Sequence, residues 1–340
     1  MEIIGDSLEA LWVEAASAVM VGGEKRAPRG QPTRELTGMQ LVLTDPRNRI
    51  PKLPVREFSL AYGMGELAWY LCGDNTVEFI KHYAPSYGKY SDDGKLLHGA
   101  YGPRIFGKTC LCSWDEHRCN AHRGSDSQWE LCKQILQRDQ DSRQAVIAVY
   151  DRQDCDAVTK DMPCTLSLQF LVRNNALNMI VNMRSNDLWF GGVYDVFCFT
   201  ALQELMANEL KLPLGVYYHH VGSFHLYERN MPAIERCLAE YEGAPYKLPQ
   251  PRIAVNQTID ELLHSEKRIR TCAPVTALEE LCHQMEDWNW SQMPTLWELG
   301  FAAWRWKRIS NSVEIKETQR RLARGLLEER LGRLFNLCFF

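Results

Sequence analysis

The sequence has no long apolar run and no secretory leader. No stretch reaches the roughly 18–20 apolar residues that a membrane-spanning helix needs, although 45% of the 340 residues are apolar. The opening residues, Met1 to Asp6, lack the basic segment and apolar core of a signal peptide. We therefore expect a cytoplasmic protein with no membrane partner. It is long enough to bury a sizeable core, as one large domain or as one domain with an appendage.

An excess of charge of one sign is also missing. The chain has 39 Lys and Arg against 43 Asp and Glu, a formal net charge of −4. This balance gives no general attraction to the phosphates of nucleic acid. We expect no nucleic-acid partner, and we expect any bound phosphate to be held by a few placed arginines.

The twelve cysteines form no paired C-x-x-C motifs. In a cytoplasmic chain of this length they are expected to be free thiols, mostly small apolar residues of the core. A dense Cys/His segment leaves zinc open as an alternative, but its spacing fits no common zinc module and we expect no metal. Its candidate ligands are Cys110, Cys112, His117, Cys119 and His122.

Residues 161–195 carry the strongest local pattern. Two apolar runs rich in β-forming residues flank Arg173-Asn174-Asn175, which predicts a β-hairpin, and a helix is expected from about Val193 to Leu210. The hairpin brings a thiol, a cation and two acids together within a short piece of chain, with glycines giving room at the turn before the helix. We expect a functional site formed by Cys164, Arg184, Asp187 and Asp195, beside Gly191 and Gly192.

Other periodic segments predict further elements. A strand is expected over residues 39–44. Helices are expected over residues 7–21, 58–72, 127–136, 277–288, 294–307 and 313–335.

The order of motifs in this chain resembles that of thymidylate synthase and its pyrimidine-nucleotide hydroxymethylase relatives, over roughly residues 5–265. The motifs are Pro163-Cys164, Gln169-Phe170, Arg184-Ser185, Asp187, Gly191, Asp195 and Gly222 to Tyr227. The resemblance implies an α/β (α+β) fold with a mixed β-sheet and packed helices, and a late strand near residues 246–255. It also implies a homodimer and 5,10-methylenetetrahydrofolate as co-substrate. We expect a catalytic domain over residues 1–266 and a helical C-terminal extension over residues 267–340.

The resemblance implies a role for each candidate catalytic residue. Cys164 is the nucleophile that adds to carbon 6 of the pyrimidine, and Tyr101 lies near it. Glu66 lies on an apolar helix face, where burial raises the pKa of the carboxyl group and suits it to pass protons through water. Asp195 contacts the base.

Other residues are implied to bind nucleotide or folate. Arg29 holds the phosphate from one loop, with Arg26 or Arg34 as alternatives, and Arg143 reaches the partner subunit's phosphate although Gln144 replaces the family's second arginine. The nucleotide-binding set is completed by Arg184, Ser185, Gln169, His225 and Tyr227. Asp187, Gly191 and Tyr87 are on the folate side, although Tyr87 could equally be an ordinary packing aromatic.

Two departures from thymidylate synthase indicate the reaction. Thr165 stands where that enzyme has a histidine, as in the hydroxymethylases, so we expect water rather than hydride to complete the transfer. Asp195 stands where it has an asparagine. An ionised aspartate accepts from the exocyclic amine and the protonated N3 of cytosine, which predicts a cytosine base.

The sugar is not fixed by any spacing. The length and helical C-terminus resemble the hydroxymethylases that act on CMP in the biosynthesis of mildiomycin-type antibiotics. The alternatives are a dCMP hydroxymethylase, a synthase that methylates dUMP or UMP and, more remotely, a catalytically silent member that binds nucleotide or RNA.

Overall fold

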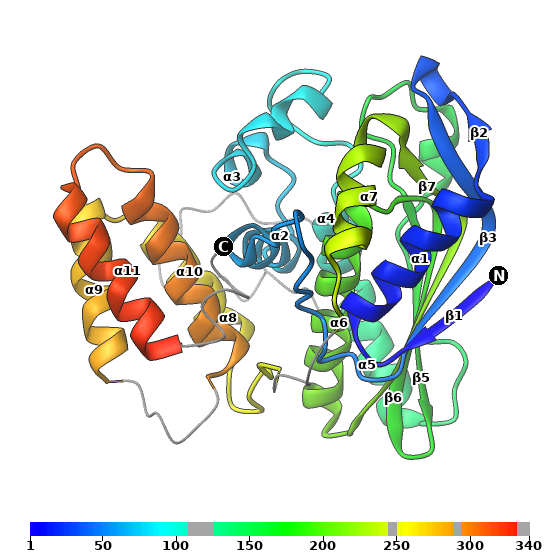
Figure 1. The fold of residues 1–340 in the computed structure, drawn as a ribbon. Helices are drawn as coiled ribbons and strands as arrows, with labels where there is room; N and C mark the ends of the chain where they lie inside the picture. The colour runs from blue at the N-terminus through cyan, green and yellow to red at the C-terminus, as the bar shows by residue number, and fades with distance from the viewer. Residues whose placement is uncertain (108–125, 244–249, 288–293, 332–340) are drawn as a thin grey trace.

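A mixed β-sheet forms one side of the molecule (Figure 1). The computed structural model describes residues 1–107, 126–243, 250–287 and 294–331. Within these residues the sheet has seven strands in the order β1-β3-β7-β6-β5-β4, with β2 paired to β3. The strands are β1 (Glu2–Gly5), β2 (Glu24–Arg26), β3 (Thr33–Leu43), β4 (Val146–Ala148), β5 (Thr165–Arg173), β6 (Ala176–Asp187) and β7 (Leu214–Tyr227).

The helices lie in layers on one side of the sheet, with α1 and α6 packed against it (Figure 1). They are α1 (Leu8–Gly22), α2 (Leu60–Leu71), α3 (Val77–Lys81), α4 (Tyr101–Phe106), α5 (Gln128–Arg138), α6 (Gly191–Leu210), α7 (Met231–Glu240), α8 (Ile259–Thr271), α9 (Pro274–Glu286), α10 (Leu296–Ser310) and α11 (Glu317–Leu331). Short 3-10 turns include η1 (Pro28–Gly30) and η2 (Pro85–Tyr90). In the described part of the chain, no helix is long and apolar enough to cross a membrane.

The predicted hairpin is confirmed as β5 and β6. Arg173 pairs with Ala176, and the two residues between them, Asn174 and Asn175, have φ of 53° and 58°. Asparagine tolerates this left-handed backbone, and two such residues form the type I′ turn that joins right-twisted strands. The turn fixes which residues of β5 and β6 face each other.

Strand pairing collects the expected site residues at one edge of the sheet. Cys164 lies directly before β5, and its carbonyl accepts from the backbone N–H of Arg184 (2.8 Å). Strands β6 and β7 are parallel and place Asp187 beside His225. The same register explains why Asp187 and His225, on different strands, share one site.

Helix α6 lies between the sheet and α2 (Figure 1) and is apolar almost all round. Phe197, Phe199 and Leu202 are fully buried within it. A helix of this composition is stable only when protein covers every side, which the sheet and α2 provide. It begins at Gly191, two residues before the expected start at Val193, so Asp195 lies in its second turn.

The C-terminal helices α8 to α11 form a further layer against α2 (Figure 1). The Trp304 Nε1–H donates to the Ala61 carbonyl of α2 (3.0 Å), and the Tyr83 hydroxyl donates to Glu266. The expected division between residues 266 and 267 falls inside α8, a helix that the sequence interpretation did not include. The expected late strand is wrong for residues 250–255, which form no strand.

Candidate functional site

The Cys164 thiol and the Arg184 guanidinium lie in contact. Arg184 Nη2 is 3.6 Å from Cys164 Sγ. The same guanidinium donates to the carbonyls of Pro163 (2.9 Å) and Met162 (3.0 Å). These bonds fasten the arginine to the segment that carries the thiol, so its charge is held at the sulfur.

Burial and charge act in opposite directions on the Cys164 thiol. Burial is the larger effect and raises the pKa of Cys164, while the Arg184 and Arg29 charges oppose it. Arg29 lies in η1 with φ 52°, whereas Arg26 pairs with Glu24 and Arg34 pairs with Glu228. Arg29 is therefore the loop arginine whose charge reaches this site.

Glu66 of α2 is buried beside α6. Its Oε1 accepts from the Tyr62 hydroxyl (3.0 Å), and Oε2 lies 3.9 Å from Cys198 Sγ. Burial raises the pKa of Glu66 to about 7, in the direction expected from its apolar helix face. A carboxyl group with this pKa exchanges protons near neutrality. Sequence reasoning missed Cys198 and Tyr62 because they read as ordinary core residues.

Two of the predicted aromatic residues, Tyr101 and Tyr87, lie near the buried acids Glu66 and Asp195. The Tyr101 hydroxyl accepts from the Thr165 backbone N–H (3.3 Å), next to the expected nucleophile. Tyr87 of η2 packs edge-on to Trp69, with ring centroids 5.9 Å apart. Burial raises the pKa of both tyrosines, with Asp195 adding to the effect, so both phenols are neutral donors near pH 7.

Asp195 is held by a residue that the sequence analysis did not single out. The Asn186 Nδ2–H donates to Asp195 Oδ2 (2.7 Å). Burial raises the pKa of Asp195 well above its usual range, Glu66 adds to this, and the Asn186 hydrogen bond opposes it. A Cβ at Gly191 would lie 3.1 Å from Asp195 Oδ2, and one at Gly192 would lie 3.0 Å from Asn186 Oδ1. The two glycines leave room for this pair, as their pattern predicted.

Asp187, His225 and Tyr227 lie together at the ends of β6 and β7. Asp187 Oδ1 accepts from the backbone N–H of Trp189 (3.0 Å). Burial raises the pKa of Asp187 and the His225 charge opposes it. The His225 and Tyr227 rings meet edge to face at 5.4 Å, because alternate residues of a strand lie on the same side of the sheet.

The remaining predicted residues lie further from the thiol. Arg143 is exposed at the start of the turn before β4, and the Gln169 Nε2–H donates to its carbonyl (3.0 Å). The structure thus connects Gln169 with Arg143 rather than with Cys164. Ser185 is half-buried on β6 and pairs in register with Ser223.

Arg56 is a further buried cation that sequence reasoning missed. Its guanidinium carbon lies 5.9 Å from the Trp189 ring centroid and 5.5 Å from that of Tyr194. Its Nε donates to the Trp189 carbonyl (2.8 Å), while the buried Nη1 has no hydrogen-bond partner among the described residues. Phe190 beside it is 56% exposed. A buried unpaired donor next to exposed aromatic surface suits a flat, anionic ligand.

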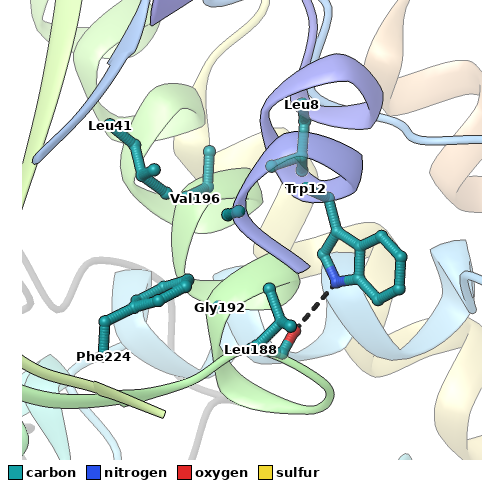
Figure 2. A pocket seen from close by; sticks show the side chains of 8 residues that line it. Leu8, Trp12, Leu41, Leu188, Gly192, Val196 and Phe224 are labelled. Atoms are coloured by element: carbon teal, nitrogen blue, oxygen red, sulfur yellow. Dashed lines mark hydrogen bonds between the residues drawn. The ribbon is translucent and has the colours of Figure 1, made fainter. Parts of the chain in front are cut away.

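A small apolar cavity lies at the start of α6 (Figure 2). Its volume of about 10 Å³ is at the limit for one water molecule, and its lining offers no group for chemistry. Trp12 lines it and donates from Nε1 to the Leu188 carbonyl (2.9 Å). Trp12 therefore anchors the residue that follows Asp187, and the cavity itself is part of the core.

Within the described residues, no group of three or more His, Cys, Asp or Glu is placed to hold a metal ion. The Cys/His segment considered for zinc lies in residues 108–125, outside the described part of the chain.

The chain is similar to known proteins over the region that holds the candidate site residues. The family described as thymidylate synthase matches residues 11–275. The deoxyuridylate hydroxymethyltransferase of Bacillus phage SP01 is 31% identical over 228 residues, covering 66% of this chain and 58% of that protein. That of Delftia phage PhiW-14 is 30% identical over 232 residues, covering 64% and 60%. The chain thus spans less than two thirds of the length of these relatives.

Among solved structures, the thermostable thymidylate synthase A of Bacillus subtilis has a similar fold. The TM-score is 0.58 at 18% identity, and the match covers 75% of this chain and 93% of that chain. The expected fold class is confirmed.

Proposed function

The chain belongs to the thymidylate synthase family, and on this premise we propose that it is a pyrimidine-nucleotide 5-hydroxymethyltransferase. The observation that carries the proposal is the contact between the Cys164 thiol and the Arg184 guanidinium, opposite the buried acids Glu66 and Asp195. The relatives that share about 30% of its sequence are named as deoxyuridylate hydroxymethyltransferases.

Cys164 begins the proposed reaction by adding to carbon 6 of the pyrimidine ring. A guanidinium 3.6 Å from the sulfur stabilises the thiolate that attacks. The addition makes carbon 5 nucleophilic, and 5,10-methylenetetrahydrofolate supplies the one-carbon unit that carbon 5 takes up. The carbon 5 proton and the tetrahydrofolate leaving group are then lost, which leaves an exocyclic methylene on the base. After water has added to this methylene, the Cys164 sulfur leaves carbon 6 and the ring double bond is restored.

Folate fits the side of the site formed by Asp187, Arg56 and the aromatic residues beside them. Asp187 offers a buried carboxylate to a pterin N–H, and the unpaired Arg56 Nη1 offers a cation. Gly191 leaves space at the start of α6, and Tyr87 supplies an aromatic ring near Glu66 and Asp195.

Water is proposed to complete the transfer and leave a hydroxymethyl group. Glu66, with a pKa of about 7, holds and releases protons at the pH at which the enzyme works. Tyr101 supports the backbone directly after Cys164 and helps to keep the thiol in place.

The preferred base is proposed to be cytosine. The Asp195 carboxylate accepts from the exocyclic amine and from protonated N3, and its charge favours the protonated adduct. Deoxyuridylate is the second candidate, because the relatives are named for it and because burial favours a neutral Asp195. A neutral carboxyl group could donate to O4 of uracil and accept from its N3–H.

The preferred nucleotide is proposed to be CMP, with dCMP as the alternative sugar. Arg29, Arg184 and Ser185 provide donors for the phosphate, and His225 and Tyr227 hold the sugar hydroxyl. The support for CMP is the resemblance, noted from the sequence, of the chain's length and helical C-terminal part to the hydroxymethylases that act on CMP. We further propose that residues 1–266 form the catalytic unit and that residues 267–340 extend it.

A homodimer is proposed from the face of the sheet that no helix of the described residues covers. Helices α1, α6 and α7 lie on one side (Figure 1), whereas Leu166 on the other side is 37% exposed and Ile180 is half-buried. Arg143 is exposed in the turn that precedes β4. In a face-to-face dimer it could reach the partner's phosphate site, as the family pattern implies.

The direct test is mass spectrometry of CMP, dCMP, UMP and dUMP after incubation with the protein and methylenetetrahydrofolate. A gain of one CH2O unit on CMP supports the proposal, and the same gain mainly on dCMP or dUMP moves the substrate. A gain of CH2 would show that hydride completes the transfer. Cys164→Ser is the matched control and should form no product from any nucleotide.

A further inference from the structure

Three side chains behind Asp195 form a buried chain of hydrogen bonds. The Tyr217 hydroxyl lies 2.8 Å from His219 Nδ1, His219 Nε2 lies 3.2 Å from Asn186 Oδ1, and Asn186 Nδ2 lies 2.7 Å from Asp195 Oδ2. Tyr217 and His219 are at most 1% exposed, and Asn186 is 3% exposed. The chain ends on the carboxyl group that is proposed to bind the base.

The direction of each bond follows from the chemistry of the groups. Burial lowers the pKa of His219 to about 3, so the imidazole is neutral, with one donor nitrogen and one acceptor nitrogen. The Asn186 Oδ1 only accepts, which makes His219 Nε2 the donor and leaves Nδ1 as the acceptor. The Tyr217 hydroxyl therefore donates to Nδ1, and every donor points towards Asp195.

We propose that Asn186, held by His219 and Tyr217, is a positioning residue that orients the Asp195 carboxylate and favours its ionised form. A donor to a carboxylate stabilises the charged state, and hydrogen bonds in series polarise one another. With Asn186 on Oδ2, Oδ1 is left to face the base. The inference rests on the proposed function, because only a protonated cytosine ring needs the charge.

Other groups facing Asp195 do not replace this donor. Glu66 from α2 and Asp187 from β6 are acids that oppose its ionisation. The remaining titratable groups around it are thiols and phenols, whose pKa is raised by burial: Cys164, Cys198, Tyr70, Tyr87, Tyr101 and Tyr217. The charged state of Asp195 thus depends on Asn186.

The test compares wild type with Asn186→Leu, which keeps the number and branching of side-chain heavy atoms, and with Tyr217→Phe. One readout is the ¹³C-NMR titration of the Asp195 carboxyl carbon, and the other is the pH profile of kcat/KM for CMP and UMP. We expect Asn186→Leu to raise the Asp195 midpoint by about one pH unit, to move the rising limb of the CMP profile with it, and to lower the preference for CMP over UMP several-fold. Tyr217→Phe should shift the midpoint in the same direction by less.

Asn182→Leu is the matched control, since Asn182 lies on the same strand and donates to Ser167 Oγ instead (3.1 Å). Its midpoint should equal that of wild type. Lower activity of Asn186→Leu with an unchanged midpoint and unchanged base preference would overturn the inference. If wild type converts no nucleotide, the proposed function fails, and the shift in the Asp195 titration still decides the role of Asn186.

Discussion

The Arg184 guanidinium contacts the Cys164 sulfur at 3.6 Å. The same guanidinium donates to the carbonyls of Met162 and Pro163, the two residues directly before Cys164. One side chain therefore shapes the segment before β5 and places a positive charge on the thiol. Because burial opposes that charge, the reactivity of Cys164 depends on Arg184.

Arg184→Gln should make Cys164 less reactive towards iodoacetamide. Removing the charge that opposes burial raises the pKa of the thiol further, and each pKa unit lowers the thiolate fraction about tenfold. We expect labelling of Cys164 at pH 7.5 to slow roughly three- to tenfold, measured by peptide mass spectrometry. Arg173→Gln, on the same hairpin, is the control and should label at the wild-type rate. Equal rates in all three proteins would remove Arg184 from thiol activation.

Glu66→Gln should change how stability depends on pH. The pKa of Glu66 is about 7 in the folded protein against 4.5 when solvated, so the folded state holds this proton more tightly than the unfolded state. The contribution of Glu66 to stability is therefore greatest below pH 4.5 and falls as pH rises to about 7, by roughly 3 kcal/mol in all.

Urea unfolding between pH 4.5 and 8 measures this effect. The free energy of unfolding of Glu66→Gln should gain on wild type as pH rises across that window. Glu235→Gln, an exposed change on α7, should run parallel to wild type. Parallel curves for Glu66→Gln as well would show that Glu66 does not carry a raised pKa.

Asp195→Asn should shift base preference from cytosine towards uracil. The amide keeps one acceptor and gains a donor, which matches N3–H and O4 of uracil, and it loses the charge that favours a protonated cytosine. A change of one or two buried hydrogen bonds corresponds to roughly 1–3 kcal/mol each in relative kcat/KM. Competition between CMP and UMP, read by product mass, gives the ratio directly. An unchanged ratio would exclude Asp195 from base recognition.

Trp304→Ala should destabilise the protein and lower its activity. Trp304 is 3% exposed and joins α10 to α2, the helix that carries Glu66. We expect a loss of about 3–5 kcal/mol from the cavity, and a smaller loss for Trp304→Phe, which removes the N–H donor and part of the indole ring. Leu322→Ala, at a site 61% exposed on α11, should be close to neutral in thermal unfolding. Full activity of Trp304→Ala would show that α2 holds Glu66 in place without α10.

Local sequence patterns predicted an element well where the residues favour only one kind of backbone structure. Asn174 and Asn175 predicted the hairpin because few residues accept two successive left-handed conformations. Ser7 caps α1 and Ser127 caps α5, where the periodic segments were expected to begin. Helix α8 was missed although Ile259, Leu262, Leu263 and Ile269 are buried at helical spacing and Thr258 and Glu261 form a capping box.

The sequence by itself determined the hairpin, the family of the chain and the set of acids, arginines and cysteine that form the candidate site, because these follow from local chemistry and motif order. Only the tertiary structure decided which groups control them. Asn186, His219 and Tyr217 form a chain of hydrogen bonds that ends on Asp195, and Arg56 lies near Asp187, through contacts between segments far apart in the chain. Burial, which sets the pKa of Glu66 and Asp195, is likewise a property of the packed layers and not of any one segment.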